Sequence, residues 1–151
     1  MSNPNDGEAI SKTSNGANCL FCKIVAKEIP SDPIYEDEDV YAFADIHPNN
    51  LGHTLVVPKK HSENIYKTDD ADLVAITAAA KKVAIGMKKA LGAEGVNIMM
   101  NNEKAAGQLI FHSHVHVIPR YEGDGYTHWK GPEKTKGEIS EAAQKIKDAL
   151  A

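Results

Sequence analysis

The chain has 151 residues, a length that fits one domain, and its 42% hydrophobic and 25% charged residues are ordinary for a soluble globular protein. A formal net charge of −4 provides no general basic surface, so we expect no binding to duplex nucleic acid. No apolar run approaches the roughly 20 residues of a membrane span. The first residues also lack a signal-peptide pattern, so we expect a cytoplasmic protein with no membrane partner.

The first part of the chain is predicted to combine a tail, a short helix and short strands. Residues 1–18 are rich in Ser, Asn and Gly and have no periodic pattern, which predicts a disordered tail before a single domain over residues 19–151. A short helix begins at Leu20 and is closed by Ile29-Pro30, because the residue before a proline disfavours helical backbone. Short strands are then predicted over the following ranges: 33–36, 40–44 and 53–58.

The second part is predicted to place one long helix among further strands. Asp69 or Asp70 can cap a helix that runs to about Leu91, where Gly92 ends it. Its apolar stripe has helical spacing and comprises Leu73, Ile76, Thr77, Ala80, Val83, Ala84, Met87 and Leu91. The remaining predicted elements are strands over 96–100 and 110–119 and an amphipathic helix over 138–150. This order indicates an α+β fold with a mainly antiparallel sheet.

The most informative stretch is His112-Ser113-His114-Val115-His116. On a strand, residues two apart point the same way, so the three imidazoles would share one face, about 7 Å apart in steps of two. Three explanations are open. The rings are buried and hydrogen-bonded, or a His-x-His pair presents ring nitrogens to Zn²⁺, or one ring is a nucleophile. An imidazole with a pKa of about 6.5 is largely neutral and nucleophilic at cellular pH.

Cys19 and Cys22 form a second candidate site, because two cysteines are too few for a disulfide framework. They could be two free or buried thiols. A redox dithiol is a further option, but the βαβ pattern that usually surrounds one is missing. A structural zinc is favoured, because thiolates are strong Zn²⁺ ligands and two histidines would complete a tetrahedron.

The loop before the triad adds a resemblance to a known family. Gly107 permits close approach of a backbone N–H to a phosphate, and Gln108 offers a neutral amide. With the three histidines, this loop resembles the histidine triad (HIT) family, whose pattern is His-apolar-His-apolar-His-apolar-apolar. Segments that look like the Hint-like branch of that family follow in the expected order: 20–30, 42–46, 52–61 and 118–121.

The resemblance implies a HIT-like fold with a five-stranded sheet and a hydrolase or transferase of nucleotides. The substrates would be purine nucleoside phosphoramidates or related adenosine 5′-phosphate esters. His114 would attack the α-phosphorus and form a covalent nucleotidyl-histidine, while the carbonyl of His112 accepts the proton of its other nitrogen. His116 would hydrogen-bond the phosphate, and His53 would support the triad. No magnesium would be required for the chemistry.

The resemblance also implies how the substrate would be bound. Asn101, Gly107 and Gln108 would contact the phosphate or the leaving group. Asp45 would accept hydrogen bonds from the ribose hydroxyls, which suits a carboxylate. The residues that would line the purine slot are apolar: Leu20, Phe21, Ile24, Phe43 and Ile46. Plain core packing is an equally open explanation for each of these apolar residues.

Zinc and a second subunit complete what the resemblance implies. One structural zinc per chain would be held by Cys19, Cys22, His61 and His112, and it would take no part in the chemistry. The protein would form a homodimer through the long helix and the strand edges.

Two residues depart from the family pattern. Ser113 stands where the family has an apolar residue, and Leu109 stands where Hint-like members usually carry Ser or Thr. Alternative functions are a non-enzymatic nucleotide-binding or adaptor protein, a dinucleoside polyphosphate hydrolase, and a hydrolase whose triad itself holds zinc. His47, His128 and Trp129 receive no role.

Overall fold

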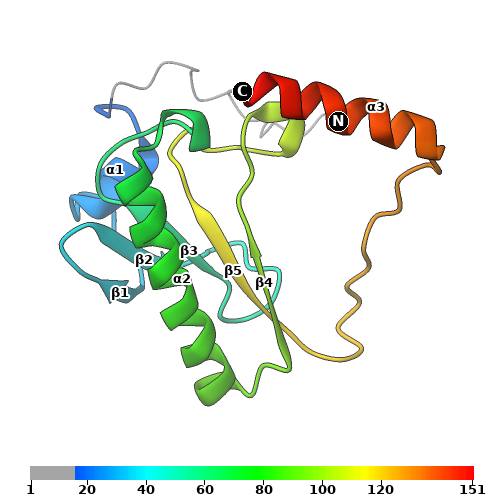
Figure 1. Ribbon diagram of the computed structural model, residues 1–151. Coiled ribbons are helices and arrows are strands. Elements are labelled where there is room, and N and C mark those ends of the chain that lie inside the picture. The colour runs from blue at the N-terminus through cyan, green and yellow to red at the C-terminus, as the bar shows by residue number, and fades with distance from the viewer. Residues whose placement is uncertain (1–15) are drawn as a thin grey trace, which may run out of the picture.

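The computed structural model describes residues 16–151 and contains a five-stranded sheet in the order β1-β2-β3-β5-β4 (Figure 1). Every neighbouring pair of strands is antiparallel. The strands are β1 (Pro33–Glu36), β2 (Val40–Ala44), β3 (Thr54–Pro58), β4 (Gly95–Met99) and β5 (Val115–Arg120). The predicted α+β class is therefore confirmed. Most of the predicted tail, residues 1–15, lies outside the described residues, and Gly16 to Asn18 lead into Cys19 through a turn.

The predicted helices are present, although the first one ends at Val25, before the predicted stop at Ile29-Pro30, and Lys27 after it has a φ of 62°. The helices are α1 (Leu20–Val25), α2 (Asp70–Leu91) and α3 (Lys136–Ala149), with short 3₁₀ turns η1 (Ile65–Lys67) and η2 (Lys104–Ala106). Asp69 is the N-cap residue of α2, and Gly92 ends the helix in the left-handed conformation that glycine adopts without strain. Within residues 16–151, none of the helices has the length and apolar character needed to span a membrane.

Both faces of the sheet are covered, by different helices. Side chains of the first face pack with α2, and this cluster includes Val40, Ala42, Val56, Val115, Val117, Ile76, Ala80, Val83 and Met87. Side chains of the opposite face pack with α1, and this cluster includes Tyr41, Phe43, Leu55, Val57, Phe21, Ile24 and Cys19. Because side chains alternate between the two faces along each strand, the same strands contribute to the core under α2 and to a second apolar cluster under α1.

The strand that carries the triad begins later than the sequence predicts. β5 starts at Val115, so of the three histidines only His116 lies in the ladder, opposite Leu55 of β3 and Met99 of β4. The backbone before it is used elsewhere, because Ser113 N–H donates to the Ser62 carbonyl at 2.8 Å. The predicted strand over 110–119 is therefore wrong for residues 110–114, although the Phe21 ring packs edge to face against both His112 and His114.

The C-terminal helix α3 follows a long connection after β5 (Figure 1). It begins two residues before its predicted start, at a capping box in which Thr135 and Glu138 satisfy each other's backbone N–H groups. None of its residues is buried, so this predicted amphipathic helix contributes nothing to the core described above.

Replacing Ile76 by alanine should destabilise the fold, because this fully buried side chain joins α2 to the sheet. An Ile→Ala change in a core costs about 2–5 kcal/mol, part of it from the cavity that remains. The matched control is Ile139→Ala on α3, whose side chain is exposed and should cost less than about 0.5 kcal/mol. Urea unfolding followed by circular dichroism measures both, and equal costs would contradict this account of the core.

Candidate functional site

A cavity of about 590 Å³ opens on the α1 face of the sheet. Most of the residues predicted to bind substrate line it: Leu20, Phe21, Ile24, Phe43, Asp45, Ile46, His53, Asn101, Gly107, His114 and His116. The fold thus brings together segments that are far apart in the sequence. A mainly apolar cleft with a few convergent polar groups is typical of a small-molecule site.

His114 is the central polar group of this cavity. Its Nδ1 donates to the carbonyl of His112 at 2.6 Å, so the Nε2 atom keeps its lone pair. The Phe21 ring packs against the imidazole edge to face, with centroids 5.1 Å apart. Burial lowers the pKa of His114 to about 4, although the bond to the carbonyl opposes this. The ring is therefore neutral near pH 7, with one nitrogen available as a nucleophile.

A second histidine pair lies beside it. His53 Nδ1 accepts the backbone N–H of Asn49 at 3.2 Å, which assigns the proton of the neutral ring to Nε2. That nitrogen is 2.9 Å from His116 Nδ1, so His53 donates and His116 carries its own proton on Nε2. Burial lowers the pKa of both histidines, while Asp45 raises it to a smaller extent. The pair therefore leaves a neutral N–H donor on His116, next to His114.

Asp45 follows the end of β2 at the side of the cavity. Its Oδ1 accepts the backbone N–H of His47 at 2.8 Å, and its Oδ2 is 3.6 Å from His53 Nε2. The half-buried carboxylate keeps acceptor capacity toward the cavity. His47 itself is exposed, at the rim of the cavity.

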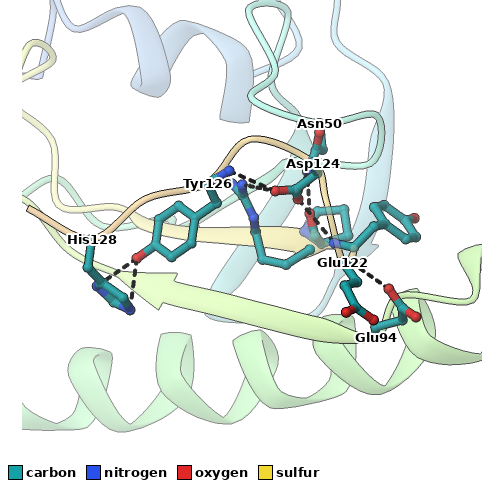
Figure 2. A network of polar contacts seen from close by, with 9 residues as sticks. Asn50, Glu94, Glu122, Asp124, Tyr126 and His128 are labelled. Atoms are coloured by element: carbon teal, nitrogen blue, oxygen red, sulfur yellow. Dashed lines mark hydrogen bonds and ion pairs between the residues drawn. The ribbon is translucent and has the colours of Figure 1, made fainter.

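The turn before His53 is held by the carboxylate of Asp124 (Figure 2). Asn50 Nδ2 donates to Asp124 at 2.9 Å and to the Pro119 carbonyl at 2.8 Å, and the Asn50 carbonyl accepts His53 N–H at 3.0 Å. The backbone N–H of Tyr121 and the guanidinium of Arg120 hold the pKa of Asp124 well below its usual range. This network links the end of β5 to the position of His53.

The loop between β4 and the triad has two kinds of residue. Asn101 and Gly107 line the cavity, and Gly107 has a φ of 85°, which favours glycine. Gln108 does not line it. Its amide donates to the carbonyls of Glu63 at 2.6 Å and Ile110 at 3.0 Å and accepts from Glu103 N–H at 2.7 Å. Gln108 therefore holds the loop through these hydrogen bonds, and its side chain is not placed to contact a phosphate as predicted.

Four predicted metal ligands converge behind the triad. Cys19, Cys22, His61 and His112 each offer one ligand atom, and all four atoms lie within 4.8 Å of one another. The two Nδ1 atoms of the histidines are 3.3 Å apart, and the contacts between sulfur and nitrogen are 3.3 to 3.5 Å. Tetrahedral zinc with bonds of about 2.3 Å to sulfur and 2.0–2.1 Å to nitrogen requires separations of about 3.3 and 3.5 Å.

The hydrogen bonds of His112 also fit a metal ligand. Its Nε2 is 2.8 Å from the Pro58 carbonyl and donates to it, which leaves a lone pair on Nδ1 toward the cysteines. Burial lowers the pKa of His112 to about 4 and raises the pKa of the Cys22 thiol to about 12. Two sulfur atoms and two imidazole Nδ1 atoms therefore face one another at the spacing of tetrahedral ligands, so the donor set fits zinc.

Some residues around the cavity were not predicted. Met99 lines it because it pairs with His116 across β4 and β5, and Ile118 lines it from β5 itself. Strand alternation from His116 points to Ile118, but Met99 requires the strand register. Leu109 is 81% exposed at the cavity rim, whereas Trp129 is exposed and outside it.

Comparison with known sequences identifies relatives of the chain. The family model described as HIT domain matches residues 26–123. A HIT-like protein of Methanocaldococcus jannaschii is 53% identical over 107 residues, which are 71% of this chain and 82% of that protein. The adenylylsulfatase HINT3 of Arabidopsis thaliana is 37% identical over 119 residues, which are 79% of this chain and 60% of that protein.

Solved structures share the fold. SMU.412c from Streptococcus mutans superposes with a TM-score of 0.84 at 38% identity, covering 100% of this chain and 96% of that one. A zinc-bound histidine triad family protein from Mycobacterium smegmatis gives a TM-score of 0.72 at 36% identity, covering 90% of this chain and 99% of that one. Together with the domain match, these similarities show that the chain belongs to the HIT family.

Proposed function

We propose that this protein is a nucleotidyl hydrolase or transferase that acts on purine nucleoside phosphoramidates or related adenosine 5′-phosphate esters. The observation that carries the proposal is the 2.6 Å hydrogen bond from His114 Nδ1 to the His112 carbonyl, inside a cavity with apolar walls. It leaves Nε2 of a neutral ring free to attack. The similarity to an adenylylsulfatase supports an adenosine 5′-phosphate substrate.

In the first step, His114 Nε2 forms a bond to the α-phosphorus as the bond to the leaving group breaks. The imidazole becomes cationic, and its Nδ1–H bond to the His112 carbonyl becomes a charge-assisted one, which is stronger. The carbonyl therefore stabilises the reacting ring more than the resting ring, which is what catalysis requires. The leaving group departs with the electron pair of the broken bond.

In the second step, water attacks the phosphorus and the lone pair returns to His114. The amine takes a proton from solvent as it leaves in the first step, and the water that attacks in the second step returns a proton to solvent, so the two steps together consume one water. The Nε2–H group of His116 donates a hydrogen bond to the phosphoryl oxygens, and His53 holds it in that tautomer.

The remaining cavity residues bind the nucleoside. Asp45 accepts hydrogen bonds from the ribose, and the purine lies between apolar side chains from α1 and β2: Leu20, Phe21, Ile24, Phe43 and, beyond β2, Ile46. Asn101 and Gly107 contact the phosphate or the leaving group. Leu109 offers no hydroxyl there and instead presents an exposed apolar side chain to the leaving group.

Trapping the intermediate tests the proposal. The protein is mixed with an adenosine phosphoramidate, quenched within the first turnover and digested, and mass spectrometry should locate an adenylyl group on His114. His114→Asn should form no adduct and lower turnover by at least about 10³-fold, because the nucleophile is removed. His128→Asn, an exposed histidine outside the cavity, is the matched control and should keep full activity.

Two results would reject this mechanism. Tight binding of adenosine 5′-monophosphate without turnover of any phosphoramidate would favour a non-enzymatic nucleotide-binding or adaptor protein. Faster turnover of dinucleoside polyphosphates than of phosphoramidates would favour the dinucleoside polyphosphate hydrolase.

We further propose that the four converging ligands hold one structural zinc per chain. The 3.3 to 3.5 Å separations of their donor atoms support this, as does the zinc-bound relative. The ion would tie Cys19 at the start of α1 to His61 after β3 and to His112. It would supply binding energy to the fold and no step of the reaction.

Metal analysis of purified variants tests the zinc site. The wild-type protein should contain about one zinc per chain, and Cys19→Ser should lose nearly all of it and melt at a lower temperature, because a thiolate ligand is removed. His114→Asn is the control and should retain its zinc. If His114→Asn lost its zinc and Cys19→Ser retained it, the metal would be bound by the triad and the proposed site would be wrong.

A homodimer is the last part of the proposal. β4 is an edge strand with an exposed Ile98, and α2 exposes Val74 and Ile85, so strand and helix edges offer apolar surface to a second copy. Light scattering on a sizing column should give twice the chain mass. Ile98→Lys should shift the protein to monomer, whereas Ile34→Lys on the other edge strand, β1, should not. A monomeric wild-type protein would contradict the proposal.

A further inference from the structure

Three hydroxyl groups form a buried cluster behind the triad. Thr68 Oγ1 and Ser113 Oγ are 2.6 Å apart, Ser62 Oγ and Thr68 Oγ1 are 2.8 Å apart, and Ser62 Oγ is 3.2 Å from Ser113 Oγ. Ser62 directly follows the proposed zinc ligand His61, and Thr68 lies just before α2. The cluster therefore joins two parts of the connection between β3 and α2 to residue 113, the one triad position where an apolar residue was expected.

The direction of these hydrogen bonds can be assigned. Thr68 Oγ1 donates to the carbonyl of Asn64 at 2.7 Å, so it has no second proton to give to Ser113. The 2.6 Å contact therefore requires Ser113 to donate to Thr68, and Ser62 then donates into the pair. An apolar side chain at position 113 would remove the fully buried hydroxyl of this cluster and leave the Ser62 hydroxyl to bond only to Thr68, so no hydrogen bond from the side chain would hold residue 113 in place.

The backbone of Ser113 is held as firmly as its side chain. A single peptide unit joins His112 to Ser113. Its N–H donates to the Ser62 carbonyl at 2.8 Å, and its C=O accepts from His114 Nδ1 at 2.6 Å. Rotation of this peptide plane would break both bonds together. No ladder fixes the plane, because β5 begins only at Val115.

We infer that Ser113 is a positioning residue for His114. Its hydroxyl, bound to Thr68 and Ser62, fixes the peptide whose carbonyl holds the proton on His114 Nδ1. At residue 113 the hydroxyl contacts thus fix the orientation of the peptide plane, as the hydrogen bonds of the sheet do from Val115 onward. The inference rests on the proposed function, in which His114 Nε2 is the nucleophile, but its structural part concerns the tautomer of His114 and is independent of any substrate.

The experiment compares hydroxyl removal with conservative replacement at two positions of the zinc-loaded protein. Thr68→Val removes the hydroxyl at nearly constant shape, and Thr68→Ser keeps it, although Thr68 does not line the cavity. Ser113→Ala removes the hydroxyl at the triad itself. Thr77→Val on α2, whose hydroxyl bonds only to the Leu73 carbonyl, is the control for losing a threonine hydroxyl elsewhere.

Two readouts are expected to change together. In ¹⁵N spectra of the histidine rings, His114 should be a single Nδ1–H tautomer in the wild type and Thr68→Ser, and a mixture in Ser113→Ala and Thr68→Val. Turnover should fall about 10- to 100-fold in the same two variants, because a small misplacement of a nucleophile is costly. Affinity for adenosine 5′-monophosphate and zinc content should stay unchanged.

The outcomes separate the two proposals. An unchanged tautomer in both Ser113→Ala and Thr68→Val would overturn the positioning role, even with slower turnover. A tautomer mixture with unchanged adduct formation on His114 would also overturn it. If the wild-type protein forms no adduct at all, the proposed function fails, and the tautomer readout still decides whether Ser113 orients the ring.

Discussion

Backbone groups decide which nitrogen of each site histidine carries its proton, and the chemistry of the site depends on that choice. The His112 carbonyl takes the Nδ1–H of His114, the Pro58 carbonyl takes the Nε2–H of His112, and the Asn49 N–H occupies Nδ1 of His53. Side chains of the same type therefore reach different states. His114 has a free Nε2, and His112 has a free Nδ1 toward the cysteines. His53 donates from Nε2 to His116, which therefore carries its own proton on Nε2.

This division of roles depends on where the sheet ends. A ladder through His112 would have used the N–H and C=O groups that now bind Ser62 and His114. Because β5 begins at Val115, the preceding peptide is free to bond to the site, and the loop after β3 can approach it. The long helix α2 packs on one face of the sheet, and on the opposite face the short helix α1 leaves room for the cavity.

The sequence predicts local elements well, because their signals are local. The bounds of β1 and β2 and the end of α2 at Gly92 follow from strand patterns and from a glycine stop. The β-branched pattern around the triad cannot reveal that the Ser113 backbone bonds to a residue 51 positions earlier, so the start of β5 was misplaced. Gln108 was misjudged for the same reason, since its partner carbonyl on Glu63 is 45 residues away.

Most of the residues that the resemblance to the HIT family singles out line the cavity, but only the geometry explains their protonation and tautomers. The spacing of two residues suggests that His114 and His116 lie together, and their ring centroids are 5.0 Å apart, but the spacing gives no tautomers. Ser113 shows the limit most clearly. In the sequence it is only a departure from the apolar pattern of the triad, whereas in the structure its hydroxyl links the triad to Ser62 and Thr68 in the connection between β3 and α2.

The charge of the cavity has a consequence for phosphate binding. Among the cavity-lining residues described, none is Lys or Arg, and Asp45 is the only acidic residue. Burial keeps His53, His114 and His116 neutral, so a bound phosphate meets neutral N–H donors instead of cations. Such a site gains little from attraction to the resting phosphate. In the proposed reaction, however, His114 would acquire a positive charge beside the phosphoryl oxygens as it bonds to phosphorus, inside a mainly apolar cavity where charges interact strongly. The electrostatic stabilisation would then arise with the covalent bond, and it would favour the chemical step over binding alone.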